Sequence, residues 1–180
     1  VGLFKGLERT VVNSALRATE RAKLLNDLGD RLSAATDENA VLVAIADTMT
    51  DKLKYAACQV YLFDSQGRLN RHARTGMGTH HTVTAARFEG EQENAVGQAL
   101  HTRASVVVSA SEPLARRSHL LPSSRFGAAV PLLLGERTLG ALDIQTNETG
   151  AAPFEGLDLA LLEVAARMTA AALARQRETS

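Results

Sequence analysis

The stretch that decides the fold is AAVPLLLGERTLGALD, residues 128–143. Its two halves are largely apolar, β-forming runs, and a glycine and a glutamate at 135 and 136 provide a tight turn between them. The stretch therefore predicts a β-hairpin with strands at 126–134 and 138–146. Strands joined by so short a turn run antiparallel, which predicts a mainly antiparallel sheet.

Four further strands are predicted upstream from their β-forming residues and flanking turns. They are expected at 56–63, 69–75, 82–88 and 105–109. The last of these contains three consecutive valines, so we expect both of its faces to be covered. A short helix is expected at 91–102, and Pro113 and Pro122 predict irregular chain from 111 to 124.

Helical periodicity dominates both ends of the chain. The first helix is expected at 4–35, where apolar residues recur every three or four positions and proline is absent. Asp37 is a suitable N-cap for a second helix, whose apolar face includes Ile45 and Met49. The last helix is expected at 154–178 and has two largely apolar faces, one for the sheet and one for a further helix.

The first helix carries more apolar surface than a small domain can cover. Two successive spacings of four around Val11 and Ala15 interrupt its pattern, as in a coiled coil with a stutter. Two interpretations are open: an amphipathic helix lying on its own domain, or a helix that pairs with a second copy of the chain. We favour the homodimer. Its expected interface comprises Phe4, Leu7, Val11, Ala18, Leu25, Leu28, Leu32, Val164 and Met168.

This order of elements predicts an α+β fold in which helices cover a central antiparallel sheet. The two terminal helices are expected to lie together on one face of that sheet. The chain divides into an N-terminal signalling or coiled-coil helix at 1–36 and a domain at 37–180, which includes the C-terminal helix.

The bulk composition argues against several classes of function. Basic and acidic residues number 20 each, so the formal net charge is zero and no concentrated positive field favours nucleic acid. No apolar run approaches the roughly 20 residues that a membrane span needs. Cys58 is the single cysteine, which suits a reducing compartment. We expect a cytoplasmic segment without nucleic-acid or membrane contact.

Several stretches, in this order, resemble the GAF domain family over about residues 24–178. The segment Cys58-Gln-Val-Tyr-Leu-Phe-Asp64 resembles the family's opening strand, and 97–109 resembles its short helix and following strand. Residues 128–143 resemble its central hairpin, and Phe154, Asp158 and Leu162 resemble the start of its closing helix. The resemblance implies a PAS-like sheet of five or six antiparallel strands. Terminal helices would cover one face, and a short helix and loops would enclose a pocket on the other.

The resemblance also bears on chemistry. GAF domains include sensors of small ligands, chromophores and redox state, and many act only in dimerisation. The cyclic-nucleotide pattern Asn-Lys…Phe-x3-Asp-Glu is broken here, because glutamate follows Asn147 and leucine follows Asp158. A covalent bilin is not expected, because residues 111–124 lack the required cysteine. Reductases of this fold need several cysteines, and this chain has one.

Basic residues gather around the segment 111–124, and an anionic small ligand is one explanation for them. A solvated basic surface is the alternative. The candidate ligand-binding residues are Arg74, Arg116, Arg117, His119, Arg125 and Phe126. Haem-sensing members of the family place their proximal histidine in this segment, so His119 is the candidate axial ligand of a haem.

The sequence thus predicts a non-catalytic sensory or regulatory domain of a signal-transduction protein, such as a two-component system. We expect it to dimerise through its terminal helices, to bind an unidentified small molecule and to control an attached output domain. Neither a cofactor nor a metal site is predicted. The alternative is a haem-binding gas or redox sensor with His119 as axial ligand.

Overall fold

The computed structural model describes residues 2–75, 80–83, 94–118, 120, 122–147, 154 and 156–179. For residues 2–5, 71–75, 80–83 and 116 it describes the backbone alone. Everything below refers to these parts of the chain.

A six-stranded sheet forms the centre of the molecule, in the order β3-β2-β1-β6-β5-β4, and every neighbouring pair is antiparallel. The strands are β1 (Ala57–Phe63), β2 (Leu69–Thr75), β3 (His80–Val83), β4 (Val106–Ser109), β5 (Phe126–Leu134) and β6 (Arg137–Thr146). The predicted hairpin of β5 and β6 is confirmed, with its turn at Gly135. β1 and β6, which are far apart in sequence, form the middle of the sheet.

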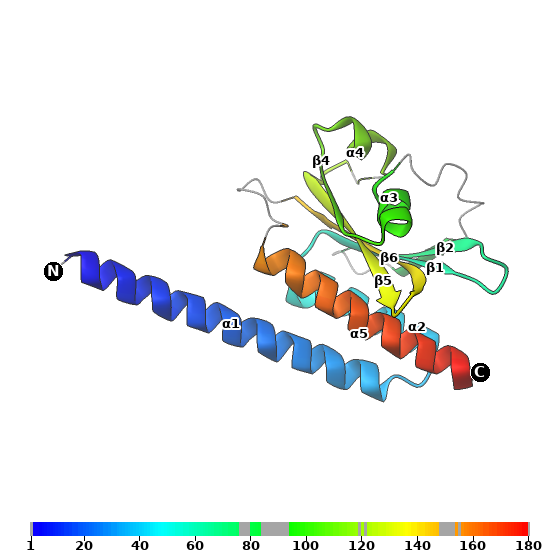
Figure 1. The fold of residues 1–180 in the computed structure, drawn as a ribbon, viewed down its shortest axis with the longest axis horizontal. Helices are drawn as coiled ribbons and strands as arrows, with labels where there is room; N and C mark the ends of the chain where they lie inside the picture. The colour runs from blue at the N-terminus through cyan, green and yellow to red at the C-terminus, as the bar shows by residue number, and fades with distance from the viewer. Residues whose placement is uncertain are drawn as a thin grey trace.

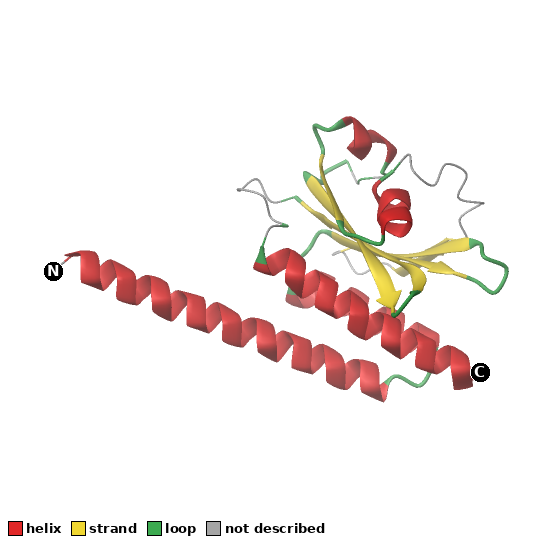
Figure 2. Ribbon diagram, in the orientation of Figure 1, coloured by secondary structure: helices red, strands yellow, loops and turns green. Residues whose placement is uncertain are grey.

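Helices cover both faces of the sheet (Figure 1), as the α+β prediction requires. The helices are α1 (Gly2–Ala34), α2 (Glu38–Asp47), α3 (Ala95–Thr102), α4 (Pro113–Arg117) and α5 (Leu157–Thr179), and a π-helical turn, η1 (Thr48–Lys52), extends α2. α1, α2 and α5 lie on one side, whereas the short helices α3 and α4 lie on the other (Figure 2). No described helix is long and apolar enough to cross a membrane.

Local capping fixes where two of these helices begin. The Asp37 carboxylate accepts a hydrogen bond of 2.7 Å from the Ala40 N–H, so the predicted N-cap of α2 is confirmed. Asn94 plays the same part for α3, where its side-chain oxygen accepts from the Gly97 N–H at 2.8 Å. Both caps satisfy amide groups that a helix terminus leaves without partners.

Alternation along the central strands builds a separate core on each face of the sheet. Cys58, Val60 and Leu62 of β1 point to the side of α1, α2 and α5, where Ile45 and Leu162 are fully buried. The intervening residues point to the side of α3 and α4. The smaller core on that side consists of Tyr61, Leu69, Ala95, Val96, Ala99, Val108, Ala115, Ala129 and Ala141.

Gly140 allows the two central strands to approach each other. A Cβ atom built at this position would overlap the main-chain carbonyl of Tyr61 on β1, so no larger residue fits without moving a strand. The glycine in the Leu-Gly-Ala-Leu-Asp segment therefore has a specific steric role at the β1–β6 pairing.

Three sequence-based expectations need correction or fall partly outside the described residues. β4 is an edge strand and Val107 is 38% exposed, so the prediction that both faces of this strand are covered was wrong. The segment 111–124 contains α4 and is not wholly irregular. β3 ends at Val83 and α3 begins at Ala95, and the remainder of the strand and helix expected between them lies outside the described residues.

α1 has two parts with different surroundings. Its second half runs parallel to α5: Arg21 pairs with Asp158 near the start of α5, and Arg175 near its end donates to the Leu32 carbonyl at 2.7 Å. The first half extends past the start of α5 (Figure 1). The second half of α1 therefore packs on its own domain, as the first interpretation predicts, and the first half does not. Pairing of the first helix with a second copy of the chain stays a prediction.

Candidate functional site

Polar side chains occupy the centre of the sheet on the face that α3 and α4 cover. Gln59 projects from β1, Asp143 and Gln145 project from β6, and Ser124 precedes β5. Their exposed fractions are 4%, 3%, 0% and 4%, respectively. We call these four residues, together with Tyr61, the polar cluster.

The strand register brings the polar cluster together. Gln59 and Asp143 are direct partners across β1 and β6, and Gln145 is one alternate position further along β6. Side chains at such positions share one face of a sheet and lie within contact distance of each other. Residues from distant parts of the sequence thus meet because β1 and β6 pair.

Hydrogen bonds link the members of the polar cluster. The Ser124 hydroxyl donates to Gln145 Oε1 at 2.9 Å, and Gln145 Nε2 donates to Asp143 Oδ2 at 3.0 Å. On the neighbouring strand, the Tyr61 hydroxyl donates to Gln59 Oε1 at 3.1 Å. These bonds fix the orientation of both glutamine amides and present the Asp143 carboxylate beside them.

Small residues surround the polar cluster on β5 and β6. Ala129 and Ala141 flank Asp143, and Gly127 pairs with Gln145. A Cβ atom at Gly127 would lie 2.7 Å from Leu120 Cδ2, so the glycine leaves room for the leucine above the sheet. Because these neighbouring side chains are small, they project only a short distance above the sheet around Asp143 and Gln145.

α3 is held over this face at both of its ends. At its N-terminus the Ala95 N–H donates to the Ser118 hydroxyl at 2.9 Å, and that hydroxyl donates to the Leu114 carbonyl of α4 at 2.7 Å. At its C-terminus Arg103 has a left-handed φ of 56° and donates to the carbonyls of Gly135 and Glu136 at 2.7 Å each. The covering helix is therefore attached to α4 at one end and to the β5–β6 turn at the other.

Folding stability by itself does not explain why the polar cluster is buried. The corresponding positions on the opposite face of the central strands hold Val60, Leu142 and Ile144, which pack in the main core. Burying a polar group costs free energy unless it is hydrogen-bonded, and a buried carboxylate costs most. A fold that needed only stability would be served equally well by apolar residues at 59, 143 and 145.

Cys58 lies on the other face of β1 and does not join the polar cluster. Burial, and secondarily the negative charge of Asp143, raises the pKa of its thiol far above the usual range. The thiol therefore stays protonated and is a poor nucleophile. Among the described residues, no group of three or more His, Cys, Asp or Glu side chains could hold a metal ion.

A family model for the GAF domain matches residues 37–173. This chain belongs to the GAF domain family. The family comprises regulatory and sensory domains of signalling proteins. The predicted family and fold are thus confirmed. No curated protein matches the sequence.

Solved structures show the same fold. The GAF domain of a phosphoenolpyruvate-protein phosphotransferase from Coxiella burnetii is similar, with a TM-score of 0.70, 18% identity and coverage of 90% of this chain and 97% of that chain. Free methionine-R-sulfoxide reductase from Neisseria meningitidis, in complex with its substrate, is similar with a TM-score of 0.68, 20% identity and coverage of 89% and 92%. A methyl-accepting chemotaxis protein has a TM-score of 0.63 at 15% identity, with coverage of 85% and 98%.

Of the ligand-binding residues expected from sequence, the structure of this GAF domain describes the side chains of Arg117, Arg125 and Phe126. Arg117 and Arg125 are exposed, and Phe126 packs against the core on the opposite, helix-bearing face. The inclusion of Phe126 in the ligand site was therefore wrong, because alternation along β5 turns it away from α3. The side chains of Arg74 and Arg116, and the whole of His119, lie outside what the structure describes.

The expected dimer residues whose side chains are described fall into three groups according to their exposure. Leu7 and Val11 are 60% and 62% exposed, Ala18 is exposed and Val164 is 43% exposed. Leu25 and Met168 are partly buried against the core. Leu28 and Leu32 are 0% and 4% exposed, so they belong to the core of their own protomer. Their assignment to the dimer interface was therefore wrong. The side chain of Phe4 is not described.

Sequence reasoning missed Gln59, Asp143 and Gln145, although a signal was present. Gln59 interrupts the apolar run of β1, and Asp143 and Gln145 occupy alternate positions around Ile144 in the otherwise apolar end of β6. In a strand buried on both faces, polar residues repeated at a spacing of two indicate a polar patch on one face.

A pocket of about 220 Å³ lies elsewhere, at the edge of the sheet where β4 begins. It is lined by Arg103, Ala104, Ser105, Val130, Pro131, Leu133, Glu163 and Arg167. Glu163 and Arg167 are exposed, and Glu163 accepts a hydrogen bond of 2.8 Å from the Ser105 hydroxyl. Because this pocket is bordered by exposed side chains, we place the candidate site at the buried polar cluster instead.

Proposed function

We propose that this GAF domain is a non-catalytic sensory module that binds a small molecule at the polar cluster and thereby controls an attached output domain. One observation carries the proposal: the centre of the sheet holds a buried, hydrogen-bonded set of polar side chains on the face that α3 and α4 cover. Binding sites typically combine apolar walls with a few polar groups of this kind.

The chemistry of the polar cluster favours a ligand with hydrogen-bond donors. Asp143 contributes a carboxylate, and negative charge at the centre of the face repels an anion. A ligand with amino, amide or hydroxyl donors complements Asp143 and Gln145, whereas the side chains of Arg117 and Arg125, first proposed for an anion, are exposed. We therefore replace the anionic ligand of the sequence-based hypothesis with a donor-rich one.

Several features support a role without catalysis. The single cysteine is buried, and its pKa is raised, so it is unsuited to a nucleophilic or redox cycle. The methionine-sulfoxide reductase that resembles this chain shares its fold at 20% identity, a level at which likeness concerns the fold alone. Absence of turnover with free methionine sulfoxide is the expected assay result.

We also propose a homodimer through the terminal helices. Seven large hydrophobic side chains of the described residues are exposed, and all except Val107 lie on α1 or α5: Leu7, Val11, Val12, Leu16, Leu157 and Val164. Several exposed large hydrophobic side chains on two helices are typical of an interaction surface.

A thermal-shift screen tests the proposed ligand class. The probes are polyamines, amino-acid amides and polyols as donor-rich compounds, and dicarboxylates and inorganic phosphate as anions. Donor-rich compounds are expected to raise the melting temperature, because a ligand that binds only the folded state stabilises it. A shift produced by the anions alone contradicts the assignment and returns the site to the arginines.

The haem alternative is tested separately, because His119 lies outside the described residues. An absorbance scan of the purified protein after addition of haemin is the measurement. No Soret shift is expected for the ligand sensor proposed here. A shifted Soret band that disappears in His119→Ala identifies a haem sensor instead.

A further inference from the structure

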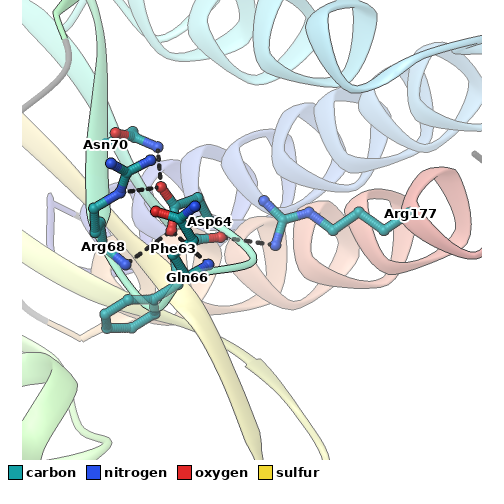
Figure 3. Close-up of polar contacts among 6 residues, drawn as sticks. All are labelled: Phe63, Asp64, Gln66, Arg68, Asn70 and Arg177. Atoms are coloured by element: carbon teal, nitrogen blue, oxygen red, sulfur yellow. Dashed lines mark hydrogen bonds and ion pairs between the residues drawn. The ribbon is translucent and has the colours of Figure 1, made fainter.

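Phe63 makes contacts on both faces of the sheet. It is the last residue of β1, the strand that also carries Gln59 and Tyr61 of the polar cluster. Its side chain packs against the core beneath α3, whereas its main-chain carbonyl accepts a hydrogen bond of 3.0 Å from Arg177 Nη1 on α5 (Figure 3). One residue thus joins the candidate site to the C-terminal helix on the opposite face.

Arg177 is part of a wider attachment at the end of α5. Its Nε atom forms an ion pair of 2.8 Å with Glu38, the first residue of α2. The two preceding residues also donate to main-chain carbonyls, Gln176 to Ala35 at 2.8 Å and Arg175 to Leu32 at 2.7 Å. Three consecutive side chains therefore tie α5 to α1, α2 and the connection between them, and Arg177 also reaches the sheet at Phe63.

The chain that follows Phe63 is fixed by Asp64 (Figure 3). Asp64 Oδ1 accepts from the main-chain N–H groups of Gln66 and Arg68, each at 2.9 Å. Its Oδ2 accepts from Arg68 Nε at 2.8 Å and from Asn70 Nδ2 at 3.5 Å. A carboxylate with this many donors holds the β1–β2 turn in one conformation. A displacement of β1 therefore moves the Phe63 carbonyl, because the rigid turn does not change its conformation to compensate.

We propose that Arg177 is the positioning residue through which a change at the polar cluster alters the C-terminal turn of α5. The route runs from Tyr61 along β1 to the Phe63 carbonyl, and from there through the Arg177 guanidinium to α5 and Glu38. β1 is hydrogen-bonded to a neighbour on each side, so it moves as a unit. The inference rests on the proposed function, because it describes how an occupied site would act on α5.

The route predicts which groups respond together. Packed side chains and hydrogen-bond networks can carry energetic coupling between two sites when both sites bias the same element. Arg177 supplies such contacts to β1 and α2 at once, with its guanidinium in a geometry that lysine or glutamine cannot reproduce. A residue that merely anchors the end of a helix would stabilise α5 without carrying a perturbation from Tyr61.

The test uses amide NMR spectra of the full chain and needs no ligand. Tyr61→Phe removes the hydroxyl that donates to Gln59 and serves as a defined perturbation of the site. It is introduced into the unmodified chain, into Arg177→Gln and into Arg167→Gln. Arg167 is an exposed arginine on the same helix and is the matched control. The readout is the change that Tyr61→Phe causes at the amides of residues 175, 176, 178 and 179.

We expect Tyr61→Phe to shift these amide resonances in the unmodified chain and in Arg167→Gln, and the shift to be lost in Arg177→Gln. An equal shift in the Arg177→Gln background, or no shift in the unmodified chain, overturns the inference. Because the perturbation is a substitution, this outcome is independent of ligand binding. Failure of the proposed function shows instead as the absence of any stabilising probe in the thermal-shift screen.

Discussion

Gln59 and Asp143 face each other across β1 and β6, and their side chains are only 4% and 3% exposed. Neither residue is near the other in sequence, and neither is needed to cover apolar surface. Their pairing at the middle of the sheet, beneath α3, is the relationship on which the functional proposal depends. It also distinguishes the two faces, because the same strands present only apolar side chains at Val60 and Leu142 on the opposite side.

The pairing that creates this site depends on Gly140. We expect Gly140→Ala to lower the free energy of unfolding by about 1–3 kcal/mol, because its Cβ would overlap the Tyr61 carbonyl and push the central strands apart. Urea denaturation followed by circular dichroism measures the effect. Gly6→Ala is the control: it meets open space within α1 and is expected to be neutral or stabilising by up to about 1 kcal/mol. Equal stability of Gly140→Ala and the unmodified chain contradicts the steric role.

The proposed homodimer is tested on the exposed part of α1. Val11→Asp introduces a charge at a side chain that is 62% exposed, and we expect it to weaken self-association at least tenfold. Analytical ultracentrifugation over a range of concentrations measures the dimer. Asn13→Asp adds the same charge at a polar position on the same helix and should leave association unchanged. A monomeric unmodified chain at high concentration rules out the homodimer.

Leu28 and Leu32 behave differently from Val11 because they lie inside the protomer. Leu28→Ala should lower the free energy of unfolding by about 2–5 kcal/mol, as expected for a fully buried leucine in a well-packed core. Thermal denaturation at several protein concentrations separates this effect from loss of the dimer. A Leu28→Ala protein that unfolds like the unmodified chain places this part of α1 outside the core.

Stability near the β1–β2 turn should depend on pH through Asp64. The main-chain donor of Arg68 is the largest of several causes that hold the pKa of Asp64 below its ordinary value of 3.8. A lowered folded-state pKa means that the carboxylate contributes stability above the unfolded-state pKa. This contribution is lost as the pH falls through the folded-state value. Asp64→Asn should therefore destabilise the protein at pH 7 and progressively less below about pH 4.

Denaturation midpoints of Asp64→Asn and the unmodified chain across this pH range supply the measurement. Asp27→Asn, on an exposed position of α1, is the matched control. A difference between Asp64→Asn and the unmodified chain that stays constant down to pH 2 would show that the charge of Asp64 is not what stabilises the turn.

Much of the fold could be predicted from sequence because local signals agreed with tertiary packing. The β5–β6 hairpin follows from the apolar runs on both sides of Gly135, and Asp37 marks the start of α2 by an ordinary capping preference. The edge position of β4 was not predictable in this way. Three valines suggest a buried strand, and only the sheet order reveals that β4 has a neighbouring strand on one side alone among the described residues, with Val107 exposed.

The candidate site was less accessible to sequence reasoning. Arginines and a histidine near 116–125 attracted a ligand hypothesis because charged side chains are conspicuous, yet Arg117 and Arg125 face solvent. Gln59 and Asp143 come together only when β1 and β6 pair, which depends on a contact between residues that are far apart in the sequence. The burial of Leu28 also depends on a long-range contact, because α5 lies beside only one half of α1.

The most direct test of the account is native mass spectrometry of the protein as purified, compared with Asp143→Asn and the exposed control Asp27→Asn. The account predicts that the unmodified chain and Asp27→Asn retain the same non-covalent small molecule, and that Asp143→Asn loses it while keeping its circular dichroism spectrum. Retention of that molecule by folded Asp143→Asn, or no bound molecule in any of the three proteins, would contradict the claim that the polar cluster is the sensory site.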